Sequence, residues 1–427
     1  MKAMRQNKKG MIEKSTSYMT AVPKNFEDIM DPDMVLARLD NAQDFDFEVL
    51  DISYEEDAEN PVVTVAYHGE TYTVDIFAEE LEIDSLYAVN HRFTEANFQA
   101  IQEAPAGLTT ALEFGPEPQE SFHLQLKLLQ CLTPDMVGII DFCSERLLSS
   151  IWARMTAESV TPPSPAYLYT IQAVQGEEQD VWLHTHGLNR CGLIELEVLG
   201  SDEAHYNAHT SILNAMASQA VCRGTLPDEG EPDYIAALPE GGILVTTWVD
   251  WETAIQWYDE GIVGGMPDRL EDHNQDTGIV FAYPAKKDYQ EKRFVPLSEI
   301  PESWMENPLF LVTNEETQRM SDLAQERIDF LRAGLNMPDC RVLVKVGLDV
   351  DPDRRDEAGT STEHIWFRLE KLDEKFLYGE LTQEPYYIKK MYKGFKAKIP
   401  VRAMTDWSID LGGTVVTPDS AYLMVWE

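Results

Sequence analysis

V-W-L-H-T-H-G-L-N-R-C-G-L-I-E-L-E-V-L-G, residues 181–200, continues as S-D-E-A-H-Y-N-A-H-T-S-I-L-N-A-M-A-S-Q-A-V-C-R, residues 201–223. These residues include four of the nine histidines of the chain. The residues before Gly187 and those after Gly192 show strand periodicity, and the residues that follow show helical spacing. The stretch therefore predicts a strand, a turn, a second strand and a helix, and we interpret the rest of the chain around it.

The histidines of this stretch suggest a metal site. Strand periodicity places His184 and His186 on one face beside Trp182, and it groups Glu195 with Glu197 on the next strand. His205 and His209 are spaced i, i+4 on the predicted helix, as in zinc enzymes. One hypothesis is thus a divalent-metal hydrolase using His184, His186, Glu195 or Glu197, and His209.

A structural role for these histidines is the alternative. The segment between His205 and His209 lacks the glutamate that would act as general base. His209 shares its helical face with Ile212, Leu213 and Met216, which predicts a hydrogen-bonded core residue. Phosphate-loop, dinucleotide-binding and nucleophile-elbow motifs are also missing from the sequence. We therefore assign no catalytic residue and no cofactor other than this hypothetical metal.

The length of 427 residues predicts several domains. Thr161-Pro162-Pro163-Ser164-Pro165 has the composition of a linker. We expect a multidomain α+β protein with antiparallel sheets, flanking helices and a mostly β C-terminal part that forms a small barrel or a curved sheet. The predicted parts are a basic lead (1–18), an N-terminal α+β domain (19–160), the linker (161–166), a central α+β domain (167–312), and a connecting helix with a β-rich domain (313–427).

The charge of the chain restricts its partners. The 75 acidic and 34 basic residues give a net charge of −41 at pH 7, which repels nucleic acids and anionic membrane surfaces. A basic protein is the partner that this charge favours, and a surface that only maintains solubility is the alternative. The five cysteines are widely spaced without a C-x-x-C pair, and the basic N-terminus is not followed by an apolar run. We expect a cytoplasmic protein.

Two charged segments and a group of aromatic residues need separate interpretations. Asp349, Asp351 and Asp353 begin like a calcium loop, but the arginine and threonine at the following key positions predict a solvated turn. The lysine-rich run 389–398 predicts an internal match to the carboxylates of the chain itself, or a solvated hairpin edge. Near the central stretch, aromatic residues are either core or exposed binding anchors: Trp248, Trp251, Trp257 and Tyr258.

The order T-H-G-L-N-R-C-G-L-I-E-L-E-V-L-G, a helix with I-L-N-A-M-A and then T-L-P-D-E-G resembles the suppressor-of-fused-like group of bacterial proteins over 181–251. The resemblance implies a binding module, in some members an immunity protein that neutralises a toxin. In the tail, 364–411 resembles a small bacterial domain of unknown function through Trp366-Phe367, Gly379-x-Leu381, Pro385, Gly394, Ile399-Pro400 and Asp406-Trp407. Together they imply an uncharacterised multidomain bacterial family.

These observations predict a protein-binding module of toxin-immunity type that captures a basic partner, with the metal-dependent hydrolase and a structural subunit as alternatives. The sequence leaves the oligomeric state open. The candidate binding residues are His184, His186, Arg190, Glu195, Glu197, Trp248, Trp251, Trp366, Asp406 and Trp407.

Overall fold

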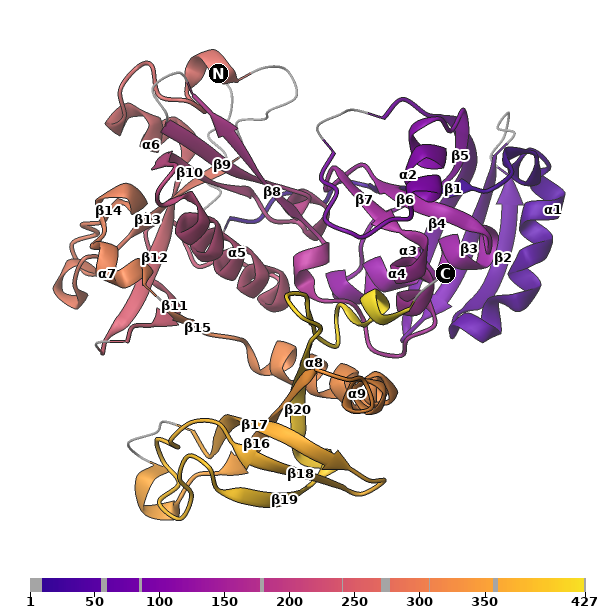
Figure 1. The fold of residues 1–427 in the computed structure, drawn as a ribbon. Helices are drawn as coiled ribbons and strands as arrows, with labels where there is room; N and C mark the ends of the chain where they lie inside the picture. Colours follow the sequence, from indigo (N-terminus) through magenta and orange to yellow (C-terminus); the bar gives the residue numbers. More distant parts are fainter. Residues whose placement is uncertain are drawn as a thin grey trace. The chain divides into compact units, whose positions relative to one another are not determined.

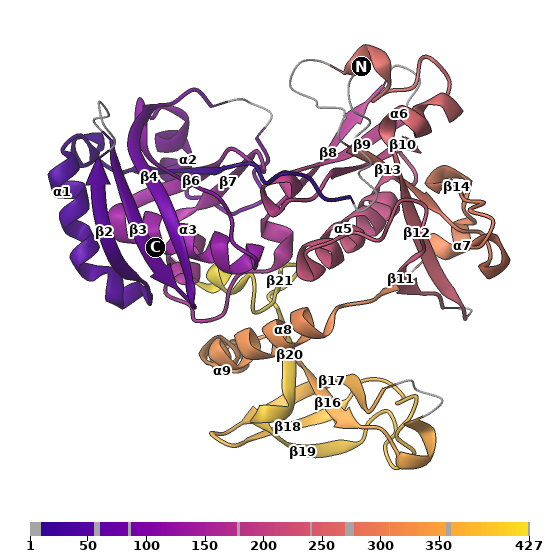
Figure 2. The same cartoon turned by 180° about the vertical axis from the view of Figure 1, so that it is seen from behind.

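The computed structural model describes residues 10–54, 60–83, 87–176, 180–239, 241–269, 277–306, 308–355 and 360–425. The chain forms two compact units. The larger unit consists of Met1–Glu158 and Ser164–Val312, and the smaller unit consists of Ser159–Pro163 and Thr313–Glu427. Figure 1 shows their helices and strands, and Figure 2 shows the same chain from behind. The α+β class predicted from the sequence is confirmed. The first unit contains both the predicted N-terminal and the predicted central domain.

The first sheet of the larger unit has seven antiparallel strands. Their order is β2 (Glu48–Tyr54), β3 (Pro61–Tyr67), β4 (Glu70–Glu80), β5 (Ala106–Leu112), β1 (Ser17–Pro23), β6 (Met136–Asp141) and β7 (Arg146–Ser149). His68 and Gly69 form the turn between β3 and β4 with φ of 48° and 88°, the positive φ values that a two-residue hairpin turn requires.

Helices cover both faces of this sheet. On one face, α3 (Pro118–Leu132) packs against α4 (Ser150–Ala157), β1 and β5, and α1 (Pro32–Ala37) is continuous with the 3-10 helix η2 (Arg38–Phe45). On the other, α2 (Glu95–Gln102) places Ile101 among Val22, Val137, Ile140 and Leu147. Strand β7, which directly precedes α4 in the chain, pairs with β6 and is buried on both faces.

The second sheet of the same unit is mixed, since β10 and β13 run parallel. Its order is β15 (Leu309–Phe310), β11 (Asp233–Ala237), β12 (Ile243–Asp250), β13 (Thr277–Ala282), β10 (Glu195–Asp202), β9 (Asp180–His186) and β8 (Thr170–Gln175), with β14 (Val295–Pro296) paired to β13. The predicted strand, turn, strand and helix are confirmed as β9, the 3-10 turn η4 (Leu188–Cys191), β10 and α5 (Tyr206–Arg223).

The two faces of this sheet carry different coverings. Helix α5 packs on one face against β9, β10 and β11. On the other face, an apolar cluster joins Trp182 and Leu199 of the sheet to Trp251 and Ala254 of α6 (Trp251–Ala254) and to Val263. The side chains of β9 and β10 that face away from α5 therefore lie beneath the segment after β12.

The smaller unit is built on an antiparallel sheet. The strand order is β19 (Lys396–Pro400), β18 (Phe376–Leu381), β17 (Thr362–Leu372), β16 (Arg341–Asp349), β20 (Met404–Asp410) and β21 (Val415–Val416). Helices α8 (Asn314–Glu326) and α9 (Ile328–Leu335) pack against it, and α7 (Glu302–Met305) precedes them in the chain. The sheet is open, so the small barrel offered as one outcome is wrong. Within the described part of the chain, no helix is both long and apolar enough to cross a bilayer.

Candidate functional site

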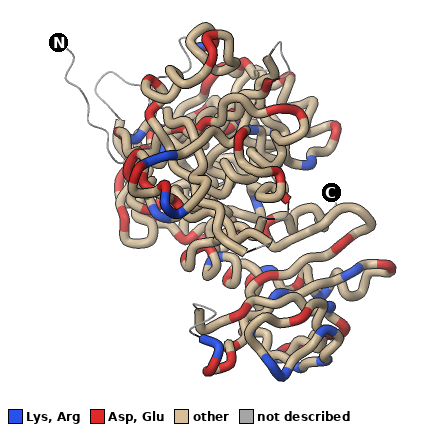
Figure 3. The backbone as a smooth tube through the Cα atoms, turned by 90° about the vertical axis from the view of Figure 1, so that its left-hand side faces the viewer, with Lys and Arg blue, Asp and Glu red and all other residues tan. Residues whose placement is uncertain are grey.

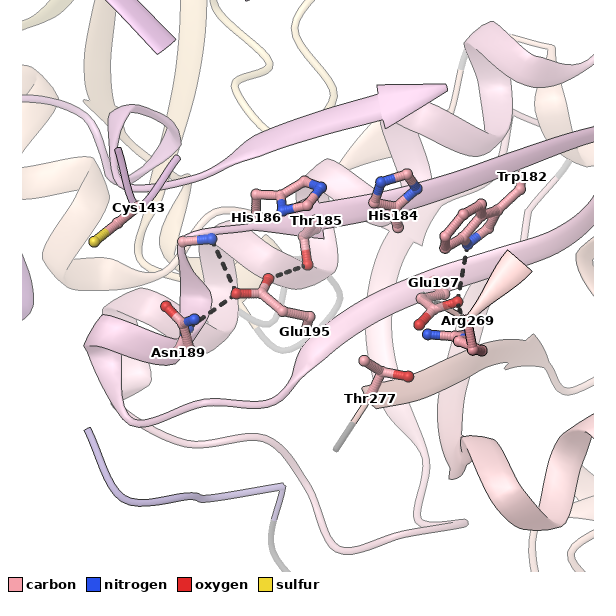
Figure 4. Close-up of a pocket in the computed structure, with 11 residues that line it drawn as sticks. Cys143, Trp182, His184, Thr185, His186, Asn189, Glu195, Glu197, Arg269 and Thr277 are labelled. Carbon is pink, nitrogen blue, oxygen red and sulfur yellow. Dashed lines mark hydrogen bonds and ion pairs between the residues drawn. The ribbon is translucent and has the colours of Figure 1, made fainter. Parts of the chain in front are cut away.

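A cavity of about 70 Å³ lies on the side of β9 and β10 that faces away from α5. Figure 4 shows the residues that line it. Its size suits a few water molecules or one small polar ligand. Four of the residues singled out from the sequence, His184, His186, Glu195 and Glu197, line it together. The other lining residues are Cys143, Trp182, Thr185, Gly187, Asn189, Arg269 and Thr277.

Strand pairing brings the histidines together at this cavity. In the ladder between β9 and β10, His184 lies opposite Glu197. The rings of Trp182 and His184 stack with centroids 4.0 Å apart, and His186 meets His184 edge-on at 4.8 Å. This is the common face that strand periodicity predicted for the three residues.

Glu195 lies at one end of the cavity within a cage of donors. Its Oε1 accepts hydrogen bonds from the backbone N–H of Gly187 at 2.9 Å and of Asn189 at 3.1 Å, and its Oε2 accepts one from Thr185 Oγ1 at 2.6 Å. Burial nevertheless raises the pKa of Glu195 from 4.5 to about 7, while these hydrogen bonds lower it. The carboxyl group therefore anchors the turn after β9 and exchanges a proton near neutral pH.

Glu197 lies at the other end of the cavity in a buried ion pair. Arg269 Nη2 is 2.6 Å from Glu197 Oε2, which also accepts a hydrogen bond from Trp182 Nε1 at 2.9 Å. The Arg269 guanidinium lies 4.3 Å from the ring centroid of Trp251 and 5.4 Å from that of Trp182. Its charge is thus compensated by a carboxylate and two aromatic faces.

The described residues contain no group of three or more His, Cys, Asp or Glu side chains suited to hold a metal ion. The proposed set is not assembled, because His209 lies on the buried face of α5 and its Nδ1 is 2.7 Å from Ser201 Oγ. This is the hydrogen-bonded core position given above as the alternative. Burial lowers the pKa of His209 to about 4, so the ring is neutral.

Cysteine chemistry is not supported at this cavity either. Figure 4 shows the Cys143 sulfur directed away from the two histidines. Burial raises the pKa of the Cys143 thiol above its ordinary value, so its reactive thiolate is scarce at neutral pH. All five cysteines are free thiols. The arrangement can bind a small polar molecule and move a proton at Glu195, and it offers no activated nucleophile.

Three candidate binding residues of the larger unit lie buried in its core. Arg190 is fully buried in an ion pair with Asp141. Trp248 on β12 is 3% exposed, and Trp251 at the start of α6 is 1% exposed within the apolar cluster on the sheet. Of the four aromatic residues considered as anchors, Trp257 remains on the surface with 55% of its area exposed.

The three candidates of the smaller unit have separate surroundings. Trp407 is buried and donates from Nε1 to the carbonyl of Ala324 at 3.1 Å. Asp406 precedes it, and burial raises the pKa of its carboxyl to about 6. Trp366 is half-buried on β17, with Lys345 Nζ 5.7 Å from its ring centroid. Trp407 therefore belongs to the core of this unit.

The lysine-rich run matches carboxylates of its own unit, as one of the two interpretations predicted. Lys396 pairs with Glu370 at 2.8 Å, and Lys389 pairs with Asp353. The Lys389 N–H also donates to Asp351 Oδ2 at 2.8 Å. Two of the three aspartates of the calcium-like segment are thus engaged by this run, which agrees with a turn.

Sequence reasoning missed Arg269 and Thr277 as cavity residues. They lie far from the central stretch in sequence. Strand β13 pairs with β10 in parallel, and no local sequence pattern predicts that pairing. Asn189 and Thr185 could have been found, because they flank the histidines and carry the polar groups that a buried glutamate needs.

Comparison with protein families gave three matches. Residues 17–163 match "Protein of unknown function (DUF4026) N-terminal", and 171–281 match "Protein of unknown function (DUF4026) C-terminal". Residues 338–417 match "Uncharacterized protein conserved in bacteria (DUF2314)". The chain belongs to an uncharacterised multidomain family. No curated protein and no solved structure matched.

These matches confirm the multidomain bacterial family of unknown function that the sequence resembles, including the small domain in the tail. The first boundary between matches, 163 to 171, falls at the proline-rich segment. The central stretch lies inside the second match, whose description assigns it no activity.

Proposed function

We propose that this protein binds a basic protein partner through the larger unit. The observation that carries the proposal is the distribution of charge. Residues 313–427 hold 21 acidic and 16 basic side chains, whereas 1–312 hold 54 acidic and 18 basic ones. Figure 3 shows Asp and Glu spread along the chain. A field of one sign accelerates association with a partner of the opposite sign.

Exposed aromatic area supplies short-range attraction that charge alone lacks. Trp257 is largely exposed, and its ring lies 5.8 Å from that of Phe294 and 5.4 Å from that of Phe281. Such a supported aromatic side chain is typical of binding hot spots. The free thiols support a reducing compartment, and we propose a cytoplasmic location and capture of the toxin-immunity type.

The experiment is affinity capture on the full-length chain, with the association rate of each captured protein then measured against salt. We expect a partner of high isoelectric point whose association rate falls at least about tenfold between about 0.05 and 0.5 M salt. A variant with Trp257→Ser should dissociate faster while it keeps the salt dependence. Partners without excess basic charge, or rates independent of salt, would contradict the proposal.

The same preparation tests the metal-hydrolase alternative. Elemental analysis of protein purified without chelator should find no metal in stoichiometric amount, because the carboxylates of Glu195 and Glu197 are engaged within the protein. About one zinc, manganese or iron per chain would favour the hydrolase instead.

A further inference from the structure

Strand β2 forms one edge of the seven-stranded sheet and leaves apolar side chains exposed. It pairs with β3 on one side, and no described strand pairs with its other side. Leu50, Ile52 and Tyr54 are 51%, 41% and 51% exposed. A free edge of this kind presents backbone N–H and C=O groups that another extended segment can pair with.

The register with β3 shows which way these side chains point. Ile52 lies opposite Val63, and Tyr54 lies opposite Pro61, on the face where β3 is buried. Val63 is completely buried, whereas Ile52, one strand further out, is not. The apolar face of the sheet therefore extends to Ile52 and Tyr54 of β2, where it is no longer buried. An additional strand with apolar side chains on this face would bury these two residues.

The opposite face of the same edge is acidic. Glu48, Asp51 and Ser53 lie opposite Ala66, Thr64 and Val62, and Val62 in turn lies opposite Asp75 of β4. Between Arg38 and Arg92 the sequence has 15 acidic residues and no lysine or arginine. Basic side chains on a neighbouring strand would meet carboxylates across the ladder on this face.

The two faces together specify an occupant. We infer that the edge of β2 binds an extended segment of the basic partner in which basic and apolar residues alternate, so that it adds as a further strand. Successive residues of a strand point to opposite faces, so the alternation places apolar side chains over Ile52 and Tyr54 and lysine or arginine beside Asp51. Glu48 adds its negative charge to the same face just beyond the bulge. This inference rests on the proposed function and gives the partner a contact at this edge in addition to the one proposed at Trp257.

A second copy of the chain fits the edge less well. Pairing two β2 strands would bring two acidic faces together, and like charges directly opposite one another destabilise a ladder. The register also shifts between Val49 and Asp51, and such a bulge limits regular pairing. The regular edge is the short segment 51–54, which suits a peptide better than a long continuous interface.

The test uses the full chain and synthetic peptides, with binding measured by fluorescence anisotropy. One peptide alternates lysine with valine. A second has the same composition with its lysines in one block, and a third repeats the alternating sequence with N-methyl groups on alternate backbone nitrogens. We expect the alternating peptide to bind at least about tenfold more tightly than the other two, and to slow amide hydrogen exchange in 51–54.

Matched variants distinguish binding at the β2 edge from attraction by the overall charge of the unit. Glu48→Lys with Asp51→Lys, and separately Ile52→Ser with Tyr54→Ser, should each weaken the alternating peptide at least about tenfold. The control, Glu260→Lys with Glu302→Lys, makes the same charge change at exposed positions elsewhere in the unit and should weaken it less than about threefold. Circular dichroism confirms that each variant folds.

Several results would overturn the inference. Equal affinity for all three peptides, or equal losses in the edge and control variants, would mean that charge alone acts; the proposed function would then stand without this site. Self-association that Ile52→Ser with Tyr54→Ser abolishes would assign the edge to a second copy. Failure of the alternating peptide to bind would also refute strand addition, while salt-dependent capture of a basic partner would still support the proposed function.

Discussion

Replacing Arg190 by methionine should destabilise the larger unit strongly, because the residue forms a buried ion pair between elements of its two sheets. Arg190 lies in η4 beside the second sheet, and Asp141 ends β6 of the first. Nη1 and Nη2 each lie 2.8 Å from a different carboxylate oxygen, and both side chains are completely buried. Burial alone would lower the pKa of the guanidinium, but the Asp141 carboxylate raises it above its ordinary value.

The expected loss of stability in Arg190→Met follows from the buried groups that lose a partner. Without the guanidinium, the Asp141 carboxylate keeps Ser144 Oγ at 2.6 Å and the N–H of Cys143 at 3.2 Å but loses its counter-charge. The carbonyl of Leu168 also loses a donor at 2.7 Å. Removing one partner of a buried pair costs about 3–5 kcal/mol. Adding Asp141→Asn removes the orphaned charge and should recover part of this loss.

Urea unfolding followed by tryptophan fluorescence and circular dichroism measures the effect. The midpoint for Arg190→Met should fall with an unchanged dependence on urea, and the double variant should lie between it and the wild type. Lys292→Met is the control, because Lys292 pairs with Glu231 at 3.1 Å with both side chains about half exposed, and should cost less than about 1 kcal/mol. A loss below about 1 kcal/mol for Arg190→Met would refute the reasoning.

Two further predictions concern the turn and the carboxyl group at the cavity. Gly187 has φ of +111°, and a Cβ there would lie 2.5 Å from the carbonyl oxygen of Leu168. Gly187→Ala should therefore lower the free energy of unfolding by at least about 2 kcal/mol. The control Gly224→Ala, at φ +66° with open space around it, should lower it less, and equal losses would contradict the steric argument. The folded state raises the pKa of Glu195 from 4.5 to about 7, so the folded protein holds this proton more tightly than the unfolded chain. Its contribution is full below pH 4.5 and is lost as pH rises to about 7, by up to about 3 kcal/mol. Free energies of unfolding measured from pH 5 to 8 should show the wild type losing stability relative to Glu195→Gln, and parallel curves would exclude the carboxyl as the cause.

Local patterns were sufficient for most individual elements of this protein. The alternation in 181–200 and the helical spacing in 206–223 are properties of neighbouring residues, and β9, β10 and α5 follow them. The common face of Trp182, His184 and His186 follows from the same geometry. His68-Gly69 fixed a hairpin because both residues tolerate positive φ there.

Tertiary structure alone decided which polar residues meet and which are hidden. Arg190 looked like a surface binding residue, but its partner Asp141 comes from another sheet. Arg269 reaches Glu197 across 72 residues of sequence, and Thr277 arrives by a parallel crossover. The exposed edge at Ile52 and Tyr54 also depended on strand order, since alternation alone would place both in a core. Sequence encodes the period of each element, whereas burial and charge pairing depend on which elements become neighbours, and that is set by the packing of the whole unit.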